Sequence, residues 1–286
     1  MSSSTHRPRL ARTPDRDLRG KVVAITGAGR GIGLATAGRF ADAGARVVIG
    51  DLDDDVAAKA AAQVGGGAEG YVVDVADRAS FATFLARAEE LGPVEVLVNN
   101  AGIMPLSPLV DQSEESIDKI LEVNLRAVIT GTQLAARTML ERGHGHVVNV
   151  ASAVGRIGMA GGAVYSASKF GVVGFSEAMQ AELAPGGVDV SVVLPTVVAT
   201  ELGAGVQATR GMRPCKPEEV ADAILAVARR PRFETWVPAY AKGIFYSSNT
   251  LPRRARDAVS HAMGADTSLS KVDLEARAEY ERRAGR

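Results

Sequence analysis

Tyr165 and Lys169 are the two side chains in this sequence best suited to transfer a proton. They are four residues apart, which places them on one face of a helix. A free tyrosine has a pKa of about 10. For tyrosine to act as a base near neutrality, this pKa must fall by about three units, which requires roughly 4 kcal/mol. A lysine ammonium ~4 Å away supplies about that much at an effective dielectric constant of about 20. Such a spacing more often marks a surface pair, so this interpretation depends on the neighbouring motifs.

Two polar residues could complete a site around this pair. Ser152 ends the apolar segment 145–152, and ligands bind at the carboxyl edge of a parallel sheet. A hydroxyl there would bind a substrate oxygen and stabilise the charge that develops on it. Asn124 lies within a long helical pattern, where asparagine is unfavourable, and this indicates a role beyond helix formation. A lone serine after a strand is more often a turn residue.

A glycine-rich turn, TGAGRGIG at 26–33, connects an apolar strand candidate to a helical segment. Glycines allow a tight turn and a close approach of the backbone to a pyrophosphate, and the helix N-terminus supplies N–H groups and partial positive charge. The turn is therefore predicted to bind a dinucleotide. Its candidate binding residues are Gly27, Gly29, Arg30, Gly31, Ile32 and Gly33.

The choice between NAD and NADP depends on Asp51 and Arg30. Asp51 ends the second strand candidate, about where a carboxylate accepts hydrogen bonds from the adenosine ribose. A carboxylate there would repel a 2′-phosphate, whereas Arg30 could meet one or remain solvated. Because Asp51 stands at the strand end, NAD is favoured over NADP.

Taken in order, the motifs resemble those of the short-chain dehydrogenase/reductase family. They comprise the glycine turn, Asn99-Asn100-Ala101-Gly102, Asn124, Ser152 and Tyr165-Ser166-Ala167-Ser168-Lys169. Each motif is modest alone, but the set is specific and spans about residues 20–200. The resemblance implies a Rossmann-type fold, a nicotinamide cofactor and the interconversion of an alcohol and a carbonyl compound.

The resemblance also implies roles for further residues. Lys169 would hydrogen-bond the nicotinamide ribose, and Asn124 would hold a water that connects Lys169 to solvent. A side chain at Thr196, where the family often has glycine, is expected to narrow the nicotinamide pocket or shift the loop. The implied cofactor contacts are Asp74 and Val75 at the adenine, Asn100, Ala101 and Gly102 in the cleft, and Pro195, Val198 and Thr200 at the nicotinamide.

The remaining pattern predicts the scaffold. Near-continuous apolar runs indicate strands covered on both faces, and their alternation with helical segments predicts a doubly wound α/β domain over 18–240, with helices on both faces of a parallel sheet. The predicted strands are 21–26, 45–51, 68–75, 95–100, 145–152, 189–195 and 235–238. The predicted helices are 32–43, 53–64, 78–91, 113–142, 163–183 and 217–229.

The two ends of the chain differ from this domain. Residues 1–17 are rich in Ser and Arg, and a disordered leader is favoured over a transit peptide. Residues 241–286 are predicted to form a helical extension. The segment 240–256, at its start, mixes apolar and basic side chains, so it could cover the pocket or build a dimer interface, and contact with a membrane surface is possible but less favoured.

Composition bears on partners and location. Lys plus Arg and Asp plus Glu both number 33. The chain therefore lacks the basic excess that would indicate nucleic acid binding. The single cysteine, Cys215, excludes an intrachain disulfide and fits a reducing compartment, so a cytoplasmic location is expected. The four histidines lack metal-ligand spacing, no metal is expected, and His144 and His146 are expected to be solvated.

The sequence thus predicts an NAD(P)-dependent oxidoreductase that interconverts a hydrophobic secondary alcohol and its ketone, with Tyr165 as general acid and base. The substrate loop is expected at 196–214, with an apolar lining; Arg210 and Arg213 could contact an acidic group but are preferred as exposed charges. The resemblance implies a homodimer or homotetramer. The alternative is a non-catalytic dinucleotide-binding sensor or scaffold on the same fold.

Overall fold

The computed structural model describes residues 15–206, 213–263, 272, 273, 275, 277, 280 and 282. Within this part, one sheet of seven parallel strands has the order β3-β2-β1-β4-β5-β6-β7. All seven predicted strand segments are present. They are β1 (Val22–Thr26), β2 (Arg46–Asp51), β3 (Glu69–Val72), β4 (Val94–Asn99), β5 (Gly145–Val150), β6 (Val188–Pro195) and β7 (Glu234–Val237).

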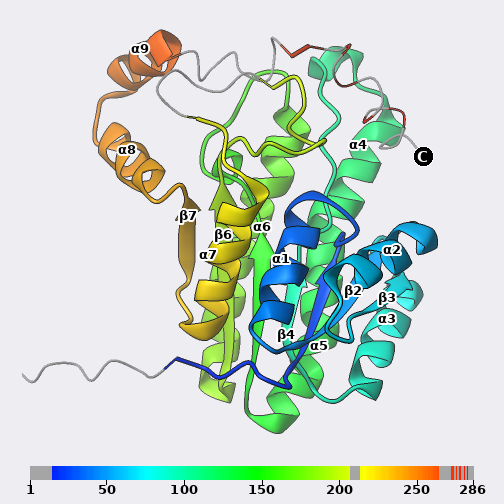
Figure 1. Ribbon diagram of the computed structural model, residues 1–286. Coiled ribbons are helices and arrows are strands. Elements are labelled where there is room, and N and C mark those ends of the chain that lie inside the picture. Colours follow the sequence, from blue (N-terminus) through cyan, green and yellow to red (C-terminus); the bar gives the residue numbers. More distant parts are fainter. Residues whose placement is uncertain are drawn as a thin grey trace, which may run out of the picture.

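Helices cover both faces of this sheet (Figure 1). One face carries α1 (Gly31–Asp42), α2 (Asp54–Val64) and α7 (Pro217–Arg229), and the other carries α3 (Arg78–Glu90), α5 (Ala127–Arg142) and α6 (Ala163–Leu183). Side chains alternate between these layers: along β1, Val23 and Ile25 face α1 and α7, while Val22 and Ala24 face α3 and α5. The predicted doubly wound Rossmann-type fold is confirmed.

The predicted helix over 113–142 is divided. It begins as α4 (Glu114–Leu121), capped by Ser113, passes through a π-helical turn at Glu122–Arg126 and continues as α5. Asn124 lies inside this turn and is fully buried. A periodicity of 3.6 does not distinguish a continuous helix from one with a single wide turn, so the sequence pattern missed the break.

The expectation that His146 is solvated is wrong. This residue is fully buried in β5, and its Nε2 contacts the Ser191 hydroxyl at 2.8 Å. Burial lowers its pKa to about 3, so the imidazole is neutral. His144, by contrast, is exposed and pairs with Glu95 at 3.2 Å.

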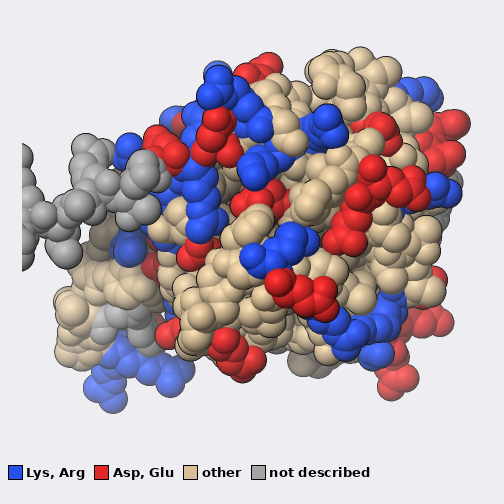
Figure 2. All heavy atoms as spheres, turned by 90° about the horizontal axis from the view of Figure 1, so that it is seen from below, with Lys and Arg blue, Asp and Glu red and all other residues tan. Residues whose placement is uncertain are grey.

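The ends of the chain are described in part. Most of the predicted leader lies outside the described residues, but the Arg16 backbone N–H donates to the Arg229 carbonyl at 2.9 Å and its guanidinium pairs with Asp189. Two helices follow β7, namely α8 (Tyr240–Asn249) and α9 (Arg253–Met263). Among the described residues, no helix is long and apolar enough to span a bilayer. Figure 2 shows basic and acidic side chains interspersed on the face viewed from below.

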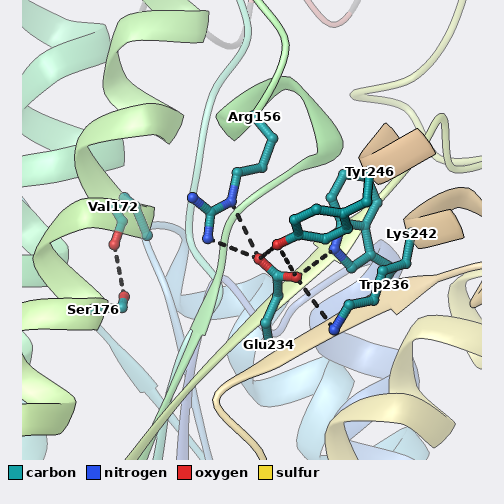
Figure 3. Close-up of polar contacts among 7 residues, drawn as sticks. All are labelled: Arg156, Val172, Ser176, Glu234, Trp236, Lys242 and Tyr246. Carbon is teal, nitrogen blue, oxygen red and sulfur yellow. Dashed lines mark hydrogen bonds and ion pairs between the residues drawn. The ribbon is translucent and has the colours of Figure 1, made fainter. Parts of the chain in front are cut away.

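A buried carboxylate attaches α8 to the edge of the sheet (Figure 3). Glu234, the first residue of β7, accepts hydrogen bonds from Arg156 Nη2 at 2.8 Å, Trp236 Nε1 at 2.9 Å and the Tyr246 hydroxyl at 3.1 Å. Lys242 Nζ lies 3.5 Å away. The side chain of Glu234 is 7% exposed, and although burial raises its pKa, the hydrogen bonds and the Arg156 charge outweigh this and lower the pKa overall. The cluster thus joins α8, β7 and the loop after β5.

Replacing Glu234→Gln should lower the free energy of unfolding by about 1–3 kcal/mol, because Arg156 loses a buried charged partner. A carboxyl whose pKa is lowered in the folded state stabilises the fold above its unfolded pKa and loses this effect as the pH falls through the folded value. The difference between wild type and variant should therefore be full at pH 7 and shrink as the pH falls below the ordinary glutamate pKa of about 4.3. Urea unfolding over this range measures it, with Glu182→Gln on the exposed part of α6 as control. A deficit that persists unchanged in acid would contradict the ionic origin.

Candidate active site

The glycine positions of the turn between β1 and α1 cannot easily accept a side chain. Gly27 and Gly31 have φ of 61° and 53°, which L side chains rarely adopt. A Cβ on Gly33 would lie 2.3 Å from the Gly27 carbonyl oxygen, and one on Gly29 would lie 2.6 Å from Asp51 Oδ2. The turn therefore brings bare backbone to the N-terminus of α1, as dinucleotide binding requires.

Side chains from neighbouring strands hold this turn. Asp51, at the end of β2, accepts a hydrogen bond from the Gly29 backbone N–H at 2.9 Å. Asn100, just after β4, donates from Nδ2 to the carbonyls of Thr26 and Gly27 at 3.0 and 2.9 Å. Because β1 and β4 are neighbours at the point where the strand order reverses, these contacts lie where ligands bind to open α/β sheets.

A cavity of about 1000 Å³ opens over this edge of the sheet. Its walls include most of the predicted residues: Gly27, Arg30, Gly31, Ile32, Asp51, Asp74, Val75, Asn100, Ala101, Gly102, Ser152, Tyr165, Pro195, Val198 and Thr200. Gly29 and Gly33 belong to the same turn but pack against other residues of the protein. Asn124 and Lys169 are buried behind the wall near Gly102, where an added Cβ would lie 3.2 Å from Asn124 Oδ1 and 3.5 Å from Lys169 Nζ.

The proton-transfer candidates meet at one side of this cavity. Tyr165 and Lys169 come from α6, Ser152 follows β5, and all three are buried. Lys169 Nζ donates to the Val150 carbonyl at 3.1 Å and lies 5.9 Å from the centre of the Tyr165 ring. The predicted cluster is thus assembled around the carboxyl end of β5.

The protonation states of this cluster differ from the expectation. Burial raises the pKa of Tyr165 to about 12, against the opposing effects of a hydrogen bond with Ser152 and the Arg277 charge. Burial also lowers the pKa of Lys169 to about 8. Removal from water disfavours the charged form of both groups, so the pKa of Tyr165 rises although Lys169 is nearby. Tyr165 here is a protonated group.

Asn124 binds the loop that follows β4. Its Oδ1 accepts from the Ile103 backbone N–H and its Nδ2 donates to the Ile103 carbonyl, both at 2.8 Å, while Nδ2 also lies 3.2 Å from Ser168 Oγ. The side chain therefore fixes the backbone of a loop that lines the cavity. Its role in holding a water for Lys169 stays a prediction.

The substrate side of the cavity is largely apolar. Among its lining side chains are Met104, Val154, Ile157, Met159, Val197 and Leu202. Arg213 does not reach it, because its guanidinium pairs with Glu219 at 2.6 Å; Arg210 and Met212 lie outside the described residues.

Cys215 is buried, and burial raises the pKa of its thiol. No cluster of three or more potential metal ligands occurs among the residues that the structure describes.

Two C-terminal residues belong to the site although no sequence motif indicated them. Tyr280 lines the cavity, and its hydroxyl accepts a hydrogen bond from the Met104 backbone N–H at 2.6 Å. Arg277 is fully buried beside it. A pocket cover was one of the expectations for 240–256, but among the described C-terminal residues it is Tyr280 that lines the cavity.

Comparison with known proteins agrees with this geometry. The sequence profile of the family described as short chain dehydrogenase matches residues 21–211. The chain is 44% identical over 193 residues to D-threitol dehydrogenase of Mycolicibacterium smegmatis, covering 66% of this chain and 74% of that protein. It is 34% identical over 260 residues to the probable oxidoreductase EphD of Mycobacterium tuberculosis, covering 82% of this chain but only 44% of that protein.

A solved structure extends the likeness to a bound cofactor. A short chain dehydrogenase/reductase from Burkholderia phymatum in complex with NAD superimposes with a TM-score of 0.75 and 26% identity, over 81% of this chain and 93% of that one. The glycine turn fits such a dinucleotide, because it presents backbone without side chains to the cavity at Gly27 and Gly31.

Replacing Gly33→Ala should weaken binding of a nicotinamide dinucleotide by roughly tenfold or more, about 1.4 kcal/mol. The added Cβ collides with backbone at Gly27 and Ala28, which cannot move aside as a side chain can. Fluorescence titration of the reduced dinucleotide measures the dissociation constant. Gly38→Ala, in the same helix with no atom within 4 Å of the added Cβ, is the matched control and should bind as wild type. Equal affinities in the two variants would contradict this function of the turn.

Proposed function

Because this chain belongs to the short-chain dehydrogenase/reductase family, oxidoreductases that act on CH–OH groups with NAD or NADP, we propose that it interconverts a hydrophobic secondary alcohol and its ketone. The observation that carries this proposal is the position of Tyr165. Its buried side chain lines the cavity between the glycine turn and an apolar wall, with Ser152 and Lys169 beside it.

In the reducing direction, Tyr165 donates its proton to the carbonyl oxygen of the substrate. The reduced nicotinamide, when bound, supplies the hydride that the carbonyl carbon accepts. Ser152 donates a hydrogen bond to the same oxygen and stabilises the negative charge that develops there. Tyr165 is left as a tyrosinate, which Lys169 stabilises until a proton returns from solvent. In oxidation the same residues act in reverse, and the tyrosinate removes the hydroxyl proton.

The pKa of about 12 for Tyr165 suits the acid of the reducing direction. A buried phenol keeps its proton near neutrality and delivers it where alkoxide character develops. The oxidising direction needs a lower pKa. The positive charge of an oxidised nicotinamide ring supports that change, because an opposite charge nearby favours the tyrosinate.

Two contacts support NAD as the cofactor. The Asp51 carboxylate lines the cavity at the end of β2, where it would accept hydrogen bonds from the ribose and repel a 2′-phosphate. Arg30, the cation that could have met such a phosphate, lies 3.9 Å from Glu201, and both residues line the cavity. That pairing reduces the charge that Arg30 offers to a phosphate.

The apolar wall supports a hydrophobic substrate. D-threitol, named for one relative, is a polyol that needs several hydrogen-bond partners. The wall here offers Met104, Ile157 and Met159 instead, and apolar contact favours a substrate with a hydrocarbon body. Assembly as a homodimer or homotetramer and a cytoplasmic location complete the proposal.

Replacing Tyr165→Phe should reduce kcat by about 10²–10⁴-fold, because it removes one hydroxyl that transfers the proton. Nicotinamide absorbance measures turnover of hydrophobic secondary alcohols and their ketones, with NAD and then with NADP. Wild type should use NAD more efficiently, and the variant should bind the dinucleotide with unchanged affinity. Binding without turnover of any substrate by wild type would favour a sensor, and turnover that survives in the variant would remove Tyr165 from the mechanism.

A further inference from the structure

Arg277 is a fully buried cation that binds backbone from two separate loops. Its Nη1 donates to the carbonyls of Leu202 and Ala204 at 2.8 and 3.0 Å, and its Nη2 donates to the Met104 carbonyl at 2.6 Å. A buried guanidinium is unfavourable unless its N–H groups have acceptors. The planar fork of an arginine can reach several acceptors at once, which a lysine ammonium does less well.

The two loops that Arg277 joins stand on opposite sides of β5. Met104 follows β4 and Leu202 follows β6, and in the sheet these strands flank β5, which leads into Ser152. Both Met104 and Leu202 line the cavity. Arg277 therefore bridges the substrate side of the cavity from wall to wall.

Tyr280 extends this bridge into the cavity itself. It follows Arg277 by three residues and both of these residues are helical, so the two side chains share a face. The Arg277 guanidinium lies 4.7 Å from the Tyr280 ring centre. Since the Tyr280 hydroxyl accepts from the Met104 N–H, both backbone polar groups of Met104 bind this segment.

A third contact shows close packing of the same segment against the loop after β6. The Asp273 backbone N–H donates to the Gly205 carbonyl at 3.1 Å. A Cβ on Gly205 would lie only 2.4 Å from the Asp273 carbonyl oxygen. Figure 1 shows the last described segments, in red, beside α4, whose Lys119 and Glu122 also line the cavity.

We propose that the described residues from Asp273 to Tyr280 form a docked wall of the substrate pocket, that Arg277 is the positioning residue that holds it, and that Tyr280 limits the length of substrate that fits. The inference deepens the proposed function and rests on it for the nature of the substrate. Arg277 is close enough to Tyr165 to affect its ionisation: burial raises the pKa of Tyr165, and the Arg277 charge acts against that rise.

Docking is tested without any substrate by amide hydrogen exchange on the full chain. Replacing Arg277→Met keeps the length of the side chain but removes its N–H groups, and the Met104 N–H should then exchange at least tenfold faster. The neighbouring Ile103 N–H, held by Asn124, is an internal control and should be unchanged. Arg282→Met, at an exposed position of the same segment, is the matched variant. Unchanged exchange at Met104, or acceleration at both amides, would overturn the docking.

Specificity is tested by kinetics on straight-chain methyl ketones of increasing length. In Tyr280→Ala and Arg277→Met, KM for long ketones should fall relative to KM for short ones by about fivefold or more, while the dissociation constant of NADH stays within about twofold of wild type. A uniform loss at every chain length would overturn the specificity role. If wild type binds NADH but reduces none of these ketones, the proposed substrate fails, and exchange at Met104 still decides whether the wall is docked.

Discussion

The removal of Tyr165 and Lys169 from water is the constraint on which the site depends. Both side chains lie within α6 beneath the carboxyl edge of the sheet, and burial moves the pKa of each toward its neutral form, to about 12 and about 8. A dry site strengthens every electrostatic interaction within it, so a charge that arises at Tyr165 is sensitive to each neighbouring dipole and cation. The Val150 carbonyl, Ser152 and Arg277 are the neighbours that the fold provides.

The sheet and the glycine turn could be predicted because their signals are local. β-branched runs such as VVAIT in β1 are buried on both faces, and TGAGRGIG needs glycine for reasons of backbone geometry and space that belong to the turn itself. The strand pattern was also enough to predict Ser152 at the end of β5, and the four-residue spacing was enough to predict Tyr165 and Lys169 on one face of α6. These features depend on few long-range contacts.

The rest could not be predicted because it depends on contacts between distant residues. Asn124 occupies a π-helical turn and binds Ile103, 21 residues away. Arg277 and Met104 are 173 residues apart, and the segment VDLEARAEYERR has the composition of a solvated helix. The Tyr165 pKa has a similar dependence: the spacing of Tyr165 and Lys169 indicates a nearby charge, but the cost of burial depends on the whole surrounding fold.

The ionisation of Tyr165 is the most direct measure of the central claim. In protein labelled with ¹³C at the tyrosine Cζ, the one resonance among five that disappears in Tyr165→Phe reports this group. Tyr165 should keep its proton to about pH 12 in the protein alone. On saturation with NAD, whose ring is positively charged, its pKa should fall by roughly one to three pH units. A Tyr165 that titrates like an exposed tyrosine, or a pKa that NAD leaves unchanged, would contradict its role as the acid and base of a nicotinamide-dependent site.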